Sequence, residues 1–163
     1  MNRNILCVYY SRTGNTKQAM EEIAEMLDCE VVGITDKVNR SGFFGWLRCG
    51  FDAMRKRTRP VEKPVTERAL GDYKLVIVGT PVWAGRCSSV MRSFLKRRAY
   101  EMKDIAYVIT RASEEPYKSV YDQMDGFIGR DHVAEVSLCL KSQGYHFWRD
   151  SFIKTVTDLY GEK

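Results

Sequence analysis

The sequence has few of the residues and spacings that metal sites and disulfide frameworks require. Its 163 residues include two histidines, His132 and His146, fourteen positions apart, and five cysteines without a C-x-x-C pair. These spacings match neither a zinc site nor a disulfide scaffold. We therefore expect no bound metal, and cysteines that are reduced and mostly buried.

The sequence also lacks any run of about 18 apolar residues, which excludes stable membrane insertion through a spanning helix. The N-terminal segment "MNRNILCVYY" enters a strand-like run with no cleavage site after it, so we expect a cytoplasmic protein. No internal repeat, low-complexity tract or linker divides the chain. Residues 1–163 are therefore expected to form a single domain, long enough to bury its own core.

Patterns of hydrolytic catalysis and of nucleic-acid recognition are missing as well. No Ser-His-Asp order or pair of carboxylates stands out, and Glu114 and Glu115 beside Pro116 suit a helix N-terminus. The net charge is +5, and the most basic run is "MRKRTRP" at 54–60. No DNA- or RNA-binding pattern accompanies this run, so we interpret it as a solvated surface and expect no nucleic-acid partner. We predict no catalytic residue.

Strand-like and helix-like segments alternate along the chain. Continuous apolar runs are typical of strands covered on both faces, and an alternating run is typical of an edge strand. These strand-like runs span residues 5–10, 30–34, 75–79, 105–110 and 133–140. Helical apolar stripes occupy residues 19–27, 90–95, 120–128 and 148–160. Because parallel strands need crossovers, we predict an α/β fold: a doubly wound five-stranded parallel sheet, order 2-1-3-4-5, with helices on both faces.

The long connection between the second and third strands, residues 35–72, contains a helical stripe of its own. The stripe consists of Phe43, Phe44, Leu47, Phe51 and Met54, with Trp46 beside it. A helix that is apolar on one side and basic on the other could lie on a membrane surface. A crossover helix is nearly obligatory in this connection, so we favour packing on the sheet.

The loop "YYSRTGNT", residues 9–16, lies between the first strand and the first helix. Backbone N–H groups and the positive end of the helix dipole converge at such a junction, which makes it an anion site. Ser11, Thr13 and Thr16 can add hydroxyl donors, and Gly14 can adopt angles closed to other residues. The pattern is neither G-x-x-x-x-G-K-[ST] nor G-x-G-x-x-G, which argues against a nucleoside triphosphate or dinucleotide. A phosphate site is favoured, although an ordinary N-cap turn would use the same residues.

A second loop, "GTPVWAGRCSS" at 79–89, follows the third strand. In the predicted sheet this strand lies beside the first, so both loops flank the crevice where strand order reverses and ligands bind. Trp83 stands in this loop between Pro81 and Gly85. Its position after a strand, outside any helical stripe, favours a ligand-stacking role over a core role.

Together, "YSRTGNT" after the first strand and "VGTPVWAG" after the third resemble the flavodoxin family, in particular its short bacterial flavodoxin-like proteins. The resemblance spans nearly the whole chain, including "GFFGWLRCGFDAMRKR". It implies a flavodoxin-like fold, noncovalently bound FMN and electron transfer. By position, the phosphate loop is Ser11, Arg12, Thr13, Gly14, Asn15 and Thr16. The flavin-flanking loop is Thr80, Pro81, Val82, Trp83, Ala84, Gly85 and Arg86.

The loop after the fourth strand, "TRASEEPYKS" at 110–119, departs from the family pattern. It has no glycine, and Tyr117 is its only candidate ring, so contact with the flavin would come through Arg111, Ala112 and Ser113. The favoured function is an FMN-binding electron carrier that meets a redox partner protein. Two alternatives remain: an FMN-dependent NAD(P)H or quinone oxidoreductase, and a binding module that has lost its flavin.

Overall fold

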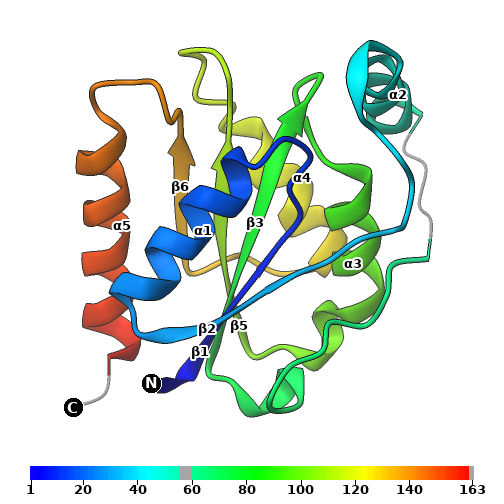
Figure 1. The fold of residues 1–163 in the computed structure, drawn as a ribbon. Coiled ribbons are helices and arrows are strands. Elements are labelled where there is room, and N and C mark those ends of the chain that lie inside the picture. Colours follow the sequence, from blue (N-terminus) through cyan, green and yellow to red (C-terminus); the bar gives the residue numbers. More distant parts are fainter. Residues whose placement is uncertain (56–59, 162–163) are drawn as a thin grey trace.

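The computed structural model describes residues 1–55 and 60–161 (Figure 1), so residues 56–59 of the basic run lie outside the described residues. The main strands are β1 (Asn2–Tyr9), β2 (Cys29–Gly33), β3 (Leu75–Trp83), β5 (Asp104–Thr110) and β6 (Ala134–Leu138). They form one parallel sheet in the order β2-β1-β3-β5-β6. A two-residue strand, β4 (Arg86–Cys87), pairs antiparallel with the end of β3. The predicted order 2-1-3-4-5 of the five parallel strands is therefore confirmed.

Helices cover both faces of this sheet, as predicted. The helices are α1 (Asn15–Met26), α2 (Gly42–Met54), α3 (Ser89–Arg98), α4 (Ser119–Ile128) and α5 (Tyr145–Tyr160), with short 3-10 turns at Leu70–Asp72 and Ala99–Glu101. Successive strand residues point to opposite faces, so Ile5 and Cys7 join one core with α1 and α5. Leu6 and Val8 join the other core with α3 and α4. Continuous apolar strands are what a sheet buried on both faces requires.

Local signals fix where two of these helices begin or end. Ser88 caps α3, since its hydroxyl accepts a hydrogen bond from the Met91 N–H at 3.2 Å. Three cations, residues 96–98, occupy the last turn of α3, where the helix dipole favours positive charge. Helix α4 ends at Gly129, whose φ of 70° is the left-handed conformation that glycine adopts readily.

Helix α2 was expected to pack on the sheet, and it does not cover either face. It stands beyond the C-terminal ends of the strands, at the upper right of Figure 1. It buries Gly45, Cys49 and Asp52, which lie on one helical face, and contributes a single described residue, Cys49, to the two cores. Its large apolar residues Phe43, Phe44, Trp46, Leu47, Phe51 and Met54 are exposed. The buried face of α2 thus carries a glycine, a cysteine and an acid, whereas an amphipathic helix usually buries its large apolar side chains.

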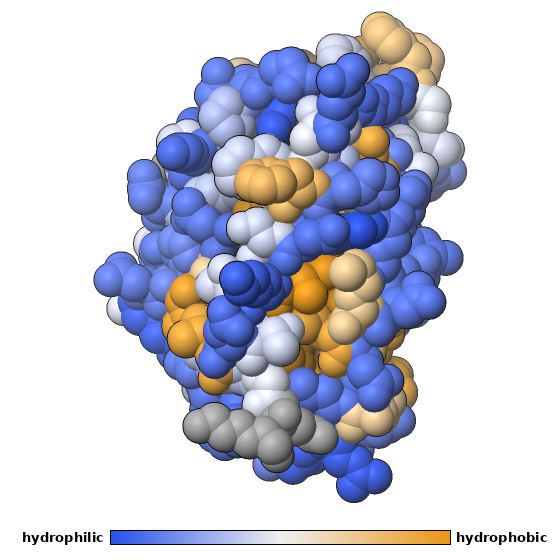
Figure 2. Space-filling view, turned by 90° about the vertical axis from the view of Figure 1, so that its left-hand side faces the viewer, coloured by the Kyte–Doolittle hydropathy of each residue, from blue (hydrophilic) through white to orange (hydrophobic). Residues whose placement is uncertain are grey.

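The face of the molecule toward the viewer in Figure 2 is mainly hydrophilic, with apolar patches between the hydrophilic areas. Within residues 1–55 and 60–161, no helix has the length and apolar character needed to cross a membrane.

Candidate functional site

A cavity of about 420 Å³ lies at the C-terminal edge of the sheet. Its walls come from the loop after β1, the ends of β3 and β5, and one side of α2. The lining residues are Arg12, Thr13, Asn15, Thr16, Trp46, Leu47, Cys49, Gly50, Phe51, Met54, Pro81, Val82, Trp83, Ala84, Thr110 and Ala112. The chain runs outward from β1 to β2 on one side and from β3 to β5 on the other, so the cavity occupies the switch point where such sheets bind ligands.

The N-terminus of α1 is available to an anion. Gly14 occupies the N-cap position with a φ of 97°, and within the described residues no side chain caps the helix. The Ser11 hydroxyl accepts from the Gly14 N–H at 3.0 Å and so shapes the loop instead of capping α1. The first turn contains no acid, while Thr13 and Asn15 are exposed and line the cavity. Uncapped N–H groups and two polar side chains fit a phosphate better than they fit an ordinary capped helix start.

Two other residues of this loop hold it against the protein. The Thr16 hydroxyl is buried and lies 2.7 Å from the Thr110 hydroxyl, which ties α1 to the end of β5. The Arg12 guanidinium donates to the carbonyl oxygen of Arg40 at 3.2 Å. Both residues line the cavity, and both fix the position of the loop around it.

Trp83 is fixed in place by its neighbours. Its ring centroid lies 5.5 Å from that of Tyr10 in an edge-on contact, and the Arg40 guanidinium lies 5.6 Å from it. The side chain lines the cavity although Trp83 is only 8% exposed. One part of the indole therefore belongs to the core, and another part borders the cavity as a preformed aromatic wall.

Another wall comes from α2, none of whose residues was predicted to belong to the site. Trp46, Leu47, Phe51 and Met54 line the cavity and remain exposed, so a flat apolar ligand could cover them. The helical stripe in residues 43–54 was the available signal. The stripe alone could not show which way it faces, because that depends on tertiary contacts of the helix.

Arg40 supplies those contacts. Its guanidinium makes two bonds of 2.6 Å to the Asp36 carboxylate and one of 3.3 Å to Asp52 of α2, and the three side chains are 1–4% exposed. Burial alone would raise the pKa of Asp36, but hydrogen bonds from Arg40 and from the Val38 N–H outweigh it and lower that pKa. The loop before α2, the helix itself and Trp83 are thus joined through one buried cation.

No protein-family model matches the sequence, and no curated protein sequence matches it, but solved structures do. A candidate flavoprotein from Bacteroides eggerthii has a TM-score of 0.75 at 16% identity, covering 98% of this chain and 99% of that one. A Lactobacillus acidophilus flavoprotein, solved in complex with FMN, has a TM-score of 0.68 at 18% identity, covering 90% and 98%. A flavodoxin, WrbA-like protein from Agrobacterium tumefaciens has a TM-score of 0.58 at 16% identity, covering 97% and 99%.

The chain has the flavodoxin-like fold. This confirms the fold that the two loop motifs imply. Eight of the predicted site residues line the cavity of the flavodoxin-like chain: Arg12, Thr13, Asn15, Thr16, Pro81, Val82, Trp83 and Ala84. The two loops therefore converge as the sheet order predicts.

Six predicted residues fall outside this cavity lining: Ser11, Gly14, Thr80, Gly85, Arg86 and Ser113. The Thr80 hydroxyl is buried and bonds with Ser88, accepting from its N–H at 3.1 Å, so it supports the start of α3. Arg86 pairs with Trp83 across the β3–β4 turn. Thr80 and Arg86 therefore shape the loop beside the cavity without lining it.

The loop after β5, predicted as residues 110–119, bonds several of its polar groups to one another and to β6. Arg111 donates to the Ser137 hydroxyl at 2.9 Å and to the carbonyl oxygen of Ser113. The Ser113 hydroxyl donates to the Tyr117 hydroxyl at 3.2 Å. From this loop the described cavity lining includes Thr110 and Ala112. Contact of this loop with a ligand would therefore come through Thr110 and Ala112, without the charge of Arg111.

Proposed function

We propose that this flavodoxin-like chain binds FMN in the cavity and acts as an electron carrier for a redox partner protein. One observation supports the proposal above all others: a single cavity joins the uncapped N-terminus of α1 to two aromatic walls. FMN has a phosphate at one end and a flat ring system at the other. The Lactobacillus acidophilus flavoprotein, a structural neighbour, was solved with FMN.

The residues present fit the two ends of FMN. The N–H groups at the start of α1, together with Thr13 and Asn15, would bind the phosphate. Trp83 and the apolar side chains of α2 would border the ring system and exclude water from it. When bound, FMN supplies the redox chemistry, and the protein contributes binding, orientation and electrostatics.

Phosphate recognition predicts a difference between FMN and riboflavin. We expect FMN to bind the apoprotein at least tenfold more tightly, since bonds to a charged group contribute about 1.5–3 kcal/mol each. Thr13→Val should weaken FMN binding about tenfold, or about 1.4 kcal/mol, and leave riboflavin binding unchanged. Titrations followed by flavin fluorescence give both dissociation constants.

A threonine outside the cavity provides the control for this experiment. Thr155→Val, on α5, should change neither constant. Equal affinities for FMN and riboflavin would remove the phosphate site from the proposal. A purified protein that is colourless and takes up no added FMN would instead favour the binding module without flavin.

A second candidate function is an FMN-dependent NAD(P)H or quinone oxidoreductase. The cavity favours it in one respect, because Trp46 and Phe51 line it and are still 58% and 57% exposed, which leaves room for a second flat substrate. As a carrier, the chain with FMN should oxidise NADPH in the presence of a quinone no faster than free FMN does. Rapid turnover by the chain alone, measured by NADPH absorbance, would decide for the enzyme.

A further inference from the structure

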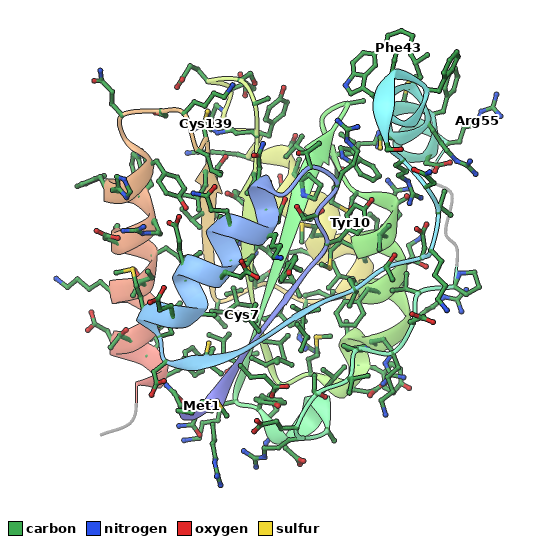
Figure 3. The ribbon with its side chains drawn as sticks, in the orientation of Figure 1. Met1, Cys7, Tyr10, Phe43, Arg55 and Cys139 are labelled. Atoms are coloured by element: carbon green, nitrogen blue, oxygen red, sulfur yellow. The ribbon has the colours of Figure 1, made fainter. Side chains whose placement is uncertain are left out.

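Helix α2 presents an aromatic surface that extends beyond the cavity. Phe43 and Phe44 are 68% and 84% exposed and do not belong to the cavity lining, so a ligand in the cavity would not cover them. The Phe43 ring stacks on Trp46 with centroids 6.1 Å apart and contacts Phe44 edge-on at 5.9 Å. In Figure 3, Phe43 extends from α2 away from the sheet. These rings form one connected cluster on the solvent side of the helix.

Cations accompany this aromatic cluster. Arg48 and Arg55 are exposed, and the Arg55 guanidinium lies 5.7 Å from the Phe51 ring. Asp52, the one acid in the sequence of α2, is buried against Arg40. We define the α2 surface as Phe43, Phe44, Trp46, Arg48 and Arg55. It combines large rings with positive charge and exposes no carboxylate from the helix.

We propose that the α2 surface docks onto an anionic lipid membrane. Trp and Phe side chains are favoured at the membrane interface, and nearby Arg side chains attract anionic headgroups. The helix would lie in the interface without crossing the bilayer, in agreement with the absence of a spanning helix in the described chain.

Charge argues against a second copy of the chain as the occupant. Two α2 surfaces in contact would bring like charges together without a carboxylate from either helix to offset them. Charge also sets the orientation on the membrane. Glu114 and Glu115 are exposed on the loop after β5, whose Ala112 lines the cavity together with α2, and an anionic surface would repel these carboxylates. This docking goes beyond the proposed function, although Trp46 of the α2 surface also lines the cavity.

Vesicle flotation tests the proposal. We expect the chain to float with vesicles of phosphatidylcholine containing about 30% phosphatidylserine, but not with phosphatidylcholine alone. About 1 M salt should release it, because salt screens the headgroup attraction. Binding should move the tryptophan emission to shorter wavelength, and this change should disappear in Trp46→Phe.

Three variants make the test specific to α2. Phe43→Ser combined with Phe44→Ser should lower vesicle binding at least tenfold, and Arg55→Glu should lower it several-fold. We choose Arg55 instead of Arg48, because the Arg48 Nε atom lies 3.9 Å from a carboxylate oxygen of Asp52 and a change there would disturb this ion pair. Phe147→Ser is the matched control, since Phe147 is 67% exposed on α5, and it should bind as the wild type does. All of these side chains are exposed, so each variant should fold, as circular dichroism can verify.

Several results would overturn the proposal. They include no binding to the anionic vesicles, equal binding to neutral vesicles, and an equal loss in Phe147→Ser. A dimer that the Phe43/Phe44 double variant dissociates would assign the α2 surface to a second copy. Capture of an acidic protein without vesicle binding would assign it to that partner. Titration of FMN with the same variants separates these outcomes from any failure of the cofactor site.

Discussion

Replacement of Arg40 by Met should lower the free energy of unfolding by about 3–5 kcal/mol, since removing one partner strands buried charges. Asp36 would lose the cation that pairs with it, and Asp52 would keep the longer pair with Arg48, at 3.9 Å. Trp83 would lose its guanidinium contact at the same time, so the cavity wall should loosen. Chemical denaturation measures the free energy of unfolding, and a change in tryptophan fluorescence reports movement of the cavity wall at Trp83.

Lys37, three positions before Arg40, offers a matched control. Lys37 pairs with Glu62 at 2.6 Å, and both of these side chains are more than half exposed. Lys37→Met should therefore cost much less stability than Arg40→Met. If Arg40→Met costs as little as Lys37→Met, the buried network does not hold α2 in place.

The pH dependence of stability should also differ between wild type and Arg40→Met. The folded pKa of Asp36 lies below its ordinary value of 3.8, so its stabilising contribution is present above that value and is lost as the pH falls through the folded pKa. Without Arg40, the pKa of Asp36 should be higher than in wild type, because burial would be opposed only by hydrogen bonds from the backbone. The stability that the protein gains as the pH rises through about 4 should therefore be smaller in Arg40→Met than in wild type.

Gly45→Ala is expected to have the second-largest effect. A Cβ at Gly45 would lie 2.1 Å from both the carbonyl carbon and the carbonyl oxygen of Arg40, so backbone would have to move. We expect a loss of about 3 kcal/mol, at the upper end of overpacking costs, together with weaker FMN binding because α2 would shift. Thermal and chemical denaturation measure the first effect, and flavin titration measures the second.

Gly50 lies on the same helix and supplies the comparison. A Cβ there meets no other atom within 4 Å, so Gly50→Ala should stabilise the chain by about 0.5–1 kcal/mol through helix propensity. Equal free energies of unfolding for Gly45→Ala and Gly50→Ala would mean that α2 does not pack against the backbone of Arg40.

The features predicted from sequence are those set by local signals. The apolar runs and the helical stripes between them indicate a doubly wound parallel sheet, and the order 2-1-3-4-5 of such a sheet brings the loops at Thr13 and Trp83 together. The direction of α2 could not be predicted in this way, because Arg40 and Asp52 meet only in the folded chain. The same holds for hydroxyl groups such as Thr80, whose bond to Ser88 depends on how the loop after β3 folds back.

The limited contact of α2 with the two cores, through Cys49, has an evolutionary consequence. Its exposed side chains can be exchanged with little loss of stability, since substitutions at exposed positions away from caps and networks usually change it by less than about 0.5 kcal/mol. Gly45, Cys49 and Asp52 are constrained, because they attach the helix to the rest of the molecule. Selection can therefore alter the molecules that contact the open side of the cavity by changing the exposed residues of α2. The sheet and the loop at residues 11–16 need not change.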